Sequence, residues 1–534
     1  MKYISINKRI KPLSSIVAFG ILLGSCTKKF EEYNTNPYGI SNEDLNKDFR
    51  LLGEPLKQVQ QSIYFATPAW NTQLQQNLIG DVYSGYMTPP TPFAGNINNM
   101  TYALVDGWNT FPWDDAYNSV MAPIQGVVKN AGEDFPEFIA WAKILKVEAM
   151  HRVSDIYGPI IYTKYGQIND DGSVSYDSQQ DAYNAFFADL DDAISVLTPM
   201  AQSGAPKTFS SFDLGYGGDY TKWVKFANTL RLRLALRIAY ADPAKAKTEG
   251  EAALSNPVGL LSSNDDNLNI NIGSTTHPLN VINNSWGDIR MGAPMESYVN
   301  GYSDPRGSKY FVPATDDAVA GQLKGIRCGI NIDAKGRYGN YSALTTFNSS
   351  IQLMTSAEAW FLKAEAALRG WSGAGDAKTD YETGITTSFG QYGLDASSYI
   401  TDATSKPSAY IDPKAITPGE NDITTGSPYL STITIKWDEG ATFDQKLERI
   451  ITQKWLAMYP DGQEAWSEFR RTGYPKLFPV VVNNSGGTIS TTDFIRRINF
   501  AQSERNTNPK GVQAATTSLG GPDTGGTPLW WDKN

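Results

Sequence analysis

Apolar residues recur with helical spacing in several long segments of the chain. Positions three, four and seven residues apart are apolar while most positions between them are polar, a pattern typical of a helix with one buried face. The pattern predicts helices over 138–156, 182–197, 223–238, 354–368, 447–458 and, more briefly, 466–469. Alanines stand at many of the contact positions, so we expect these helices to pack in close pairs, as tetratricopeptide repeats do, although the repeat consensus itself is not legible.

Long polar segments separate the predicted helices. Residues 67–109 and 262–307 are rich in Asn, Gly, Pro and aromatic residues, 397–440 in Ser, Thr and Pro, and 506–527 in Gly and Thr. Loops of this length are uncommon in a compact domain and often carry function. The alternating stretch 433–437 predicts a short strand. The expected fold is therefore mainly α: a tetratricopeptide-like helix-pair scaffold with long loop insertions and minor β structure.

The N-terminus carries a secretion signal. Four basic residues and no acidic one accompany an apolar run over 13–23, which is too short to span a bilayer. Small residues follow and end at Cys26, an arrangement similar to the bacterial lipobox, in which the cysteine becomes the lipidated first residue. The alternative is a plain signal peptide with a chance cysteine. We predict a lipoprotein signal peptide at 1–25, lipidation of Cys26, and a single domain over 26–534, where no boundary is visible.

The net charge and the counts of cysteine and histidine limit the classes of partner and cofactor that we expect. The whole chain has a net charge of −10, and loss of the four positive charges of residues 1–25 takes it to −14. That balance argues against nucleic acid, which demands a basic face. With Cys26 lipidated, Cys328 has no disulfide partner. His151 and His277 stand alone in the sequence, so neither a metal site nor a cofactor is predicted.

The common catalytic signatures are missing. The chain has no P-loop, no H-E-x-x-H or C-x-x-C zinc pattern and no G-x-S-x-G elbow. Asn169, Asp170 and Asp171 faintly resemble a calcium loop, but the acidic residue that should close it is Ser178. We therefore predict that the protein is not an enzyme. A glycoside hydrolase remains the alternative, because its carboxylate pair is defined only in space.

Aromatic residues are concentrated in the first two polar loops, 67–113 and 280–302. Flat rings stack on the C–H faces of sugars and neighbouring amides bond hydroxyls, so rings among Asn and Gly suit reversible capture of a polar oligomer. The alternative is that these rings pin the loops onto the scaffold. The candidate ligand-binding residues are Tyr83, Tyr86, Trp108, Trp286, Asn109 and Asn283.

A series of short motifs resembles the SusD/RagB family of outer-membrane nutrient-binding lipoproteins of the Bacteroidetes, and in particular its SusD-like branch. The motifs are FEEYNTNP at 30–37, VSDIYGP at 153–159, NTLRLRL at 228–234, DPR at 304–306, AEAWFLKAEA at 357–366, EAWSEFRR at 464–471, SERNTNP at 503–509 and LWWD at 529–532. Each is weak alone, but their order is specific. The chain departs from the family pattern at 160–162, where Ile-Ile-Tyr replaces the usual proline-tyrosine ending.

The resemblance implies a helical scaffold with loop-built ligand sites, anchored to the outer membrane and facing outward. It also implies a partner, a TonB-dependent channel of the SusC type, over which the lipoprotein acts as a hinged lid. Ligand contacts vary across the family, so no binding residue transfers by motif. The charged motif residues Asp155, Glu358, Glu365, Arg470 and Arg505 are interpreted as structural. Oligosaccharide and peptide ligands both stay open, as does a purely structural partner of the channel without a ligand.

Lipidation gives a first testable prediction. Replacing Cys26 with alanine removes the thiol that the lipid would modify, so the variant should be released from the membrane fraction. Fractionation and metabolic labelling with a fatty acid measure this, with the unchanged protein as the control. A variant that stays lipid-modified and membrane-bound would contradict the prediction.

Overall fold

The helices predicted from the apolar periodicity are present in the computed structural model, which describes residues 48–64 and 67–533. The signal peptide at 1–25 and Cys26 lie outside the described residues. The helices of ten or more residues are α4 (Arg50–Ile63), α8 (Ala122–Ala131), α9 (Pro136–Tyr157), α10 (Gln179–Ser203), α11 (Tyr220–Arg237), α12 (Pro243–Ser255), α16 (Ser356–Leu368), α17 (Ala377–Gly390), α18 (Phe443–Met458), α19 (Gly462–Thr472) and α21 (Pro509–Leu519).

Shorter elements fill the long segments between these helices. The α-helical ones are α5 (Ala69–Thr72), α6 (Asp106–Asn109), α7 (Phe111–Ala116), α13 (Pro278–Asn280), α14 (Ala293–Gly301), α15 (Gly307–Tyr310) and α20 (Gln502–Thr507). The π-helical turns are η1 (Gln73–Asp81), η4 (Tyr117–Met121) and η6 (Val281–Trp286), and the 3₁₀ turns are η2 (Phe93–Asn96), η3 (Asn99–Thr101), η5 (Asn264–Asp266) and η7 (Lys335–Arg337).

Strand structure is minor, as predicted. Two antiparallel pairs occur among the described residues: β1 (Met87–Thr88) with β3 (Arg290–Met291), and β2 (Leu268–Asn271) with β4 (Ser350–Met354). In the second pair Ile270 lies opposite Ile351, and a bulge follows Leu268. Each pair joins two segments that are distant in the sequence.

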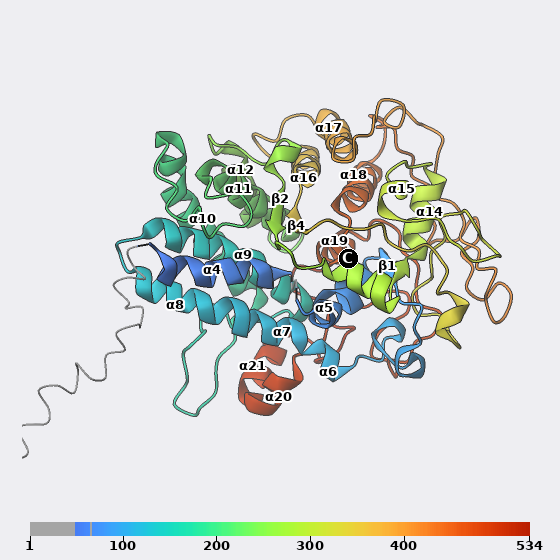
Figure 1. Cartoon of the computed structure of the whole chain (residues 1–534), viewed down its shortest axis with the longest axis horizontal. Coiled ribbons are helices and arrows are strands. Elements are labelled where there is room, and N and C mark those ends of the chain that lie inside the picture. Colours follow the sequence, from blue (N-terminus) through green and yellow to red (C-terminus); the bar gives the residue numbers. More distant parts are fainter. Residues whose placement is uncertain (1–47, 65–66, 534) are drawn as a thin grey trace, which may run out of the picture. The chain divides into compact units, whose positions relative to one another are not determined.

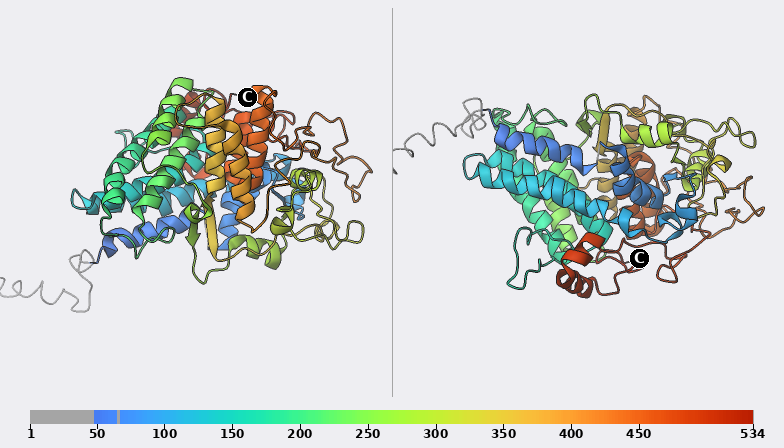
Figure 2. Two further views of the ribbon diagram at one scale, coloured as in Figure 1. Left: turned by 90° about the horizontal axis from the view of Figure 1, so that it is seen from above. Right: turned by 60° about the horizontal axis from the view of Figure 1, so that its bottom comes forward.

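The long helices pack as consecutive neighbours. α9 lies between α8 and α10, α10 packs on α11, and α11 packs on α12 (Figure 1). A second group, α16 with α17 and α18, joins the first through α11 and α16, and the yellow and orange helices of this group lie side by side in Figure 2. Paired helices that each bury one stripe against the next are the arrangement that the sequence predicted. The segment Leu52–Asn534 forms one compact unit.

Two local predictions are wrong. The stretch 433–437 is not a strand: its apolar residues are buried in alternation, but the carbonyls of Ile433 and Ile435 accept hydrogen bonds from the hydroxyls of Tyr302 and Tyr381 instead of from a neighbouring strand. The polar segment 506–527 is not all loop. It contains α21, which begins at a proline and ends before Gly520 in the left-handed conformation.

Charged side chains hold the centre of the scaffold together. This charged core comprises Glu148, His151 and Asp155 of α9, Arg233 and Arg237 of α11, Glu358 and Glu365 of α16, Lys454 of α18, and Glu464, Glu468 and Arg471 of α19. Each of these side chains is at most 2% exposed. The charged core therefore joins five helices that are far apart in the sequence.

The strongest links in the charged core are two-pronged. Arg233 donates to both carboxylate oxygens of Glu358 at 2.8 and 2.7 Å, and Arg471 donates to both oxygens of Glu365 at 2.7 Å. Burial by itself would raise the pKa of Glu468, but Arg471 and its other cationic neighbours lower that pKa well below its ordinary value. Glu468 is therefore ionised in the folded protein, because its charge is compensated on several sides.

Breaking one of these links gives a stability prediction. Glu358→Gln leaves Arg233 and Lys454 buried with less compensation, so the variant should lose about 3–5 kcal/mol of the free energy of unfolding. Denaturant unfolding followed by circular dichroism measures the loss. Asp192→Asn is the matched control, because Asp192 pairs with Lys143 at 2.8 Å but its side chain is 68% exposed. Equal effects of the two substitutions would contradict the prediction.

Candidate functional site

The two aromatic loops predicted as the ligand site meet in the structure. The β1–β3 pair places Met87 opposite Met291 and Thr88 opposite Arg290. Just beyond it, the hydroxyl of Thr91 donates to a carboxylate oxygen of Asp288 at 2.6 Å. Segments about two hundred residues apart in the sequence therefore lie side by side.

Tightly packed backbones support this region from below. η1, which belongs to the first loop, crosses the start of α19. A Cβ atom added to Gly462 of α19 would lie 2.3 Å from the Cα atom of Asp81. A Cβ on Gly80 would in turn lie 2.7 Å from the Cα atom of Gln463. Both positions need glycine because the two backbones touch. This crossing fixes the first loop against a helix of the charged core.

Aromatic rings lie on the elements around η1, four of them in two edge-on pairs. Trp70 of α5 contacts Phe111 of α7 edge-on, with ring centres 5.5 Å apart, and Trp108 of α6 contacts Phe93 of η2 edge-on at 5.7 Å. Trp70 is 48% exposed, and the other three rings are half-buried. Trp286 is also half-buried and ends η6, which packs against α5. We call these five rings the aromatic surface.

Polar groups border the aromatic surface. The amide of Asn96 donates to the side-chain oxygen of Asn331 at 3.0 Å and to the carbonyl of Ile332 at 2.8 Å. Lys335 donates to Asp288 at 2.7 Å and to the backbone carbonyl of Trp286. Half-buried rings with amides and charged groups at their border are suited to a ligand that has both C–H faces and hydroxyls.

The predicted tyrosines lie beneath the surface. Tyr83 is 8% exposed, donates its hydroxyl to the carbonyl of Asn99 at 3.0 Å and packs on Trp466. Tyr86 is fully buried and its hydroxyl bonds the carbonyl of Trp455. This placement differs from the expectation that both rings face a ligand. They anchor the loop, because a buried tyrosine is stable only where its hydroxyl finds a partner.

The predicted amides are also buried, and each makes hydrogen bonds within the protein. Asn109 is buried and its side-chain oxygen accepts from Asn99 at 2.8 Å. Asn283 is buried too, and it bonds the backbone of Leu344 in both directions, as donor and as acceptor at 3.2 Å. Of the six candidates, Trp108 and Trp286 therefore remain at the surface. Trp70, Phe93 and Phe111 were not among the residues predicted from the sequence, although all three lie within the first loop.

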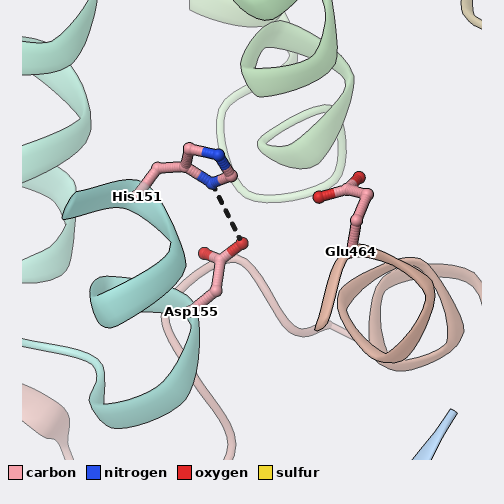
Figure 3. A group of neighbouring side chains, drawn as sticks. All are labelled: His151, Asp155 and Glu464. Carbon is pink, nitrogen blue, oxygen red and sulfur yellow. Dashed lines mark ion pairs between the residues drawn. The ribbon is translucent and has the colours of Figure 1, made fainter. Parts of the chain in front are cut away.

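One buried cluster has the residue types of a metal site. His151, Asp155 and Glu464 lie within 4.8 Å of one another, from α9 and α19 (Figure 3). Arg237, however, reaches both carboxylates, at 3.3 Å from Asp155 and 2.5 Å from Glu464. Burial opposes the charge on His151, but Asp155 and Glu148 outweigh it and raise its pKa. Because the Arg237 guanidinium already pairs with both carboxylates, we assign the cluster to the charged core.

Comparison with known proteins identifies the family. The family model described as SusD-like, Susd and RagB outer membrane lipoprotein, matches residues 32–532. The chain belongs to the SusD-like family. The order of short motifs along the sequence predicted this membership. No curated protein matches the chain. No helix among the described residues is both long enough and apolar enough to cross a membrane.

Solved structures of the SusD-like family share the fold. A chitin-binding SusD homologue from Flavobacterium johnsoniae is 46% identical, with a TM-score of 0.86, over 90% of this chain and 99% of that one. A SusD homologue from Bacteroides vulgatus is 38% identical, with a TM-score of 0.85, over 92% and 99%. A SusD-like protein from Bacteroides thetaiotaomicron is 35% identical, with a TM-score of 0.83, over 90% and 99%.

Proposed function

We propose that this SusD-like protein is a cell-surface lipoprotein of the outer membrane that binds a nutrient oligosaccharide at the aromatic surface and delivers it, unchanged, to a TonB-dependent SusC-like channel. The observation that carries the proposal is the meeting of the two aromatic loops, which leaves half-buried rings beside amides on one set of neighbouring elements. Rings of this kind give apolar contact at low entropic cost, because aromatic side chains have few rotatable bonds.

The oligosaccharide is preferred to a peptide on two grounds. The rings form edge-on pairs that are only partly buried, and aromatic rings suit the C–H faces of sugar rings. The 46%-identical homologue from Flavobacterium johnsoniae is described as chitin-binding, so β-1,4-linked N-acetylglucosamine oligomers are the first ligands to test. A peptide ligand of the same lid remains the alternative and belongs in the same binding screen.

A hydrolase is the second candidate function, because one carboxyl group has a raised pKa. Asp115 of α7 lies four residues after Phe111 of the aromatic surface. Its carboxylate accepts a hydrogen bond from the side-chain amide of Asn71 at 3.3 Å. Burial raises the pKa of Asp115 to about 6, which is the property of a general acid. A glycosidase also needs a second carboxylate across the scissile bond. Product analysis of the same oligomers, before and after Asp115→Asn, separates the two functions.

Removing the two half-buried indoles predicted from the sequence tests the ligand site. Trp108→Ala and Trp286→Ala should each weaken oligosaccharide binding about tenfold or more, because truncating an anchor ring costs over 1 kcal/mol. Isothermal titration calorimetry on the soluble form starting at Thr27 measures the affinity. Trp360→Ala is the matched control: Trp360 is a half-buried indole on α16, bonded to the carbonyl of Ser262. Normal binding by both loop variants, with melting temperatures unchanged, would contradict the site.

The channel partnership has its own test. A lid must leave the membrane together with its channel in gentle detergent, so the tagged, lipidated protein should copurify with a large β-barrel protein whose peptides match a TonB-dependent channel. Cys26→Ala is the control, since loss of the tether should reduce the recovered channel. Recovery of the lipoprotein alone, from membranes in which the channel is present, would contradict the partnership.

A further inference from the structure

A polar cavity lies at the start of the helical segment that carries Trp286. Its volume is about 460 Å³, within the range of small-molecule sites. It is lined by the β2–β4 pair, by the end of α15, by the chain after α17 and by the segment 345–348. None of the residues in its wall was selected from the sequence, because they come from segments that are far apart in the chain.

Amides from three elements meet in the wall of the cavity. Asn269 of β2 lies opposite Gln352 of β4, and Gln391 after α17 donates to the side-chain oxygen of Gln352 at 2.8 Å. Together they offer both donors and acceptors on side chains fixed by strands and by each other. Such a wall is suited to a ligand that is itself rich in donors and acceptors.

Stacked rings form another part of the wall. Phe347 stacks on the imidazole of His277, with centres 4.7 Å apart and planes 18° apart. Tyr459 stacks on Tyr310 at 4.5 Å and 27°. These pairs place apolar ring surface in the wall next to the amides. The combination matches the two surfaces of a sugar ring, C–H faces and hydroxyl edges.

Two polar atoms in this wall have unused hydrogen-bonding capacity. The hydroxyl of Tyr459, a residue only 2% exposed, and the side-chain oxygen of Gln391 are both buried without a hydrogen-bond partner among the described residues. Buried polar atoms in native proteins nearly always have partners. Other buried atoms of the described residues also lack a partner, but these two lie in residues that line a cavity, so a molecule bound there would find hydrogen-bonding capacity that the protein does not use.

The nearly uncharged lining of the cavity favours an uncharged ligand. Its described lining contains one cation, the exposed Lys309 at the rim, and no carboxylate, although the whole chain carries a net charge of −10. Burial lowers the pKa of His277 to about 3, so its imidazole is neutral at physiological pH. The interior therefore presents amides, hydroxyls and rings without a buried charge.

One structural segment connects the cavity to the aromatic surface. Asn280 of α13 bonds the backbone of Phe347 in both directions, at 2.8 and 2.9 Å. α13 continues directly into η6, which ends at Trp286, nine residues after His277. The cavity and Trp286 are therefore at opposite ends of one short helical segment, a separation that an oligosaccharide spans.

We propose that the cavity is a second saccharide subsite that takes one uncharged pyranose ring, a hexose or an N-acetylhexosamine, from the oligomer held at the aromatic surface. This inference rests on the proposed function, because it assigns the same class of ligand. The aromatic surface supplies area along the oligomer, and the cavity supplies directional hydrogen bonds to a single ring.

A plug in the cavity tests the subsite. Ser350 is half-buried in the wall at the start of β4, and Ser350→Trp fills the cavity with an indole that a strand tolerates. Ser349→Trp is the matched control, because Ser349 is exposed, precedes β4 and is not part of the wall. The probes are N-acetylglucosamine, measured by saturation-transfer NMR titration, and its β-1,4-linked tetramer, measured by calorimetry.

The expected results separate the two sites. Ser350→Trp should weaken binding of the monosaccharide about tenfold or more, a factor well above titration error, while Ser349→Trp leaves it unchanged. The double variant Trp108→Ala/Trp286→Ala should weaken the tetramer and leave the monosaccharide unaffected. Gln391→Leu, which removes the amide without filling space, should weaken the monosaccharide as well, and it serves as the second variant if the plug lowers the melting temperature.

Two results would overturn the subsite. If Ser350→Trp and Gln391→Leu bind both sugars as the wild type does, the cavity is not a subsite, while a loss in the double tryptophan variant would still support the proposed function. If the wild type binds neither sugar, the assigned ligand class is wrong for the cavity. The proposed function then depends on the wider ligand screen at the aromatic surface.

Discussion

The charged core is the constraint on which the rest of the structure depends. Buried charges are costly unless each one has compensating partners at good geometry. Here the partners come from α9, α11, α16, α18 and α19, so the pairing is complete only when these helices occupy one mutual arrangement. Apolar stripes alone would allow neighbouring helices to slide, whereas a two-pronged pair such as Arg233 with Glu358 fixes both register and distance.

The loops inherit their positions from this scaffold. Two hydrogen bonds join the first aromatic loop to α18. The Tyr86 hydroxyl donates to the carbonyl of Trp455, and the Trp455 indole donates to the carbonyl of Ser84 at 2.9 Å. Trp455 is the residue after Lys454 of the charged core. The first aromatic loop is therefore tied within one residue of the ionic network, and the β1–β3 pair then fixes the second loop to the first.

This hierarchy explains why the aromatic residues of one loop have different roles. Rings that reach inward, such as Tyr83, gain burial and a partner for their hydroxyl, and they hold the loop in place. Rings that remain half-buried, such as Trp108, keep part of their surface exposed. A rigid support beneath such rings limits the ordering cost of binding, because the surface is already formed before a ligand arrives. The polar cavity beside α13 is likewise formed before a ligand arrives, and its wall has amides where the aromatic surface has indoles.

The sequence by itself determined the helices, the family and the two loops that meet, because apolar periodicity and short motifs are local properties of the chain. It also indicated that Asp155, Glu358 and Glu365 are structural. It could not distinguish Tyr86 from Trp108, since both stand among Asn and Gly, and only the tertiary structure decides which ring finds a buried partner. Nor could it predict the charged core or the cavity, whose residues come together from segments up to several hundred positions apart. Local patterns fix secondary structure and the face that is buried. The pairing of charges and the shape of a cavity are set by which of those faces pack together.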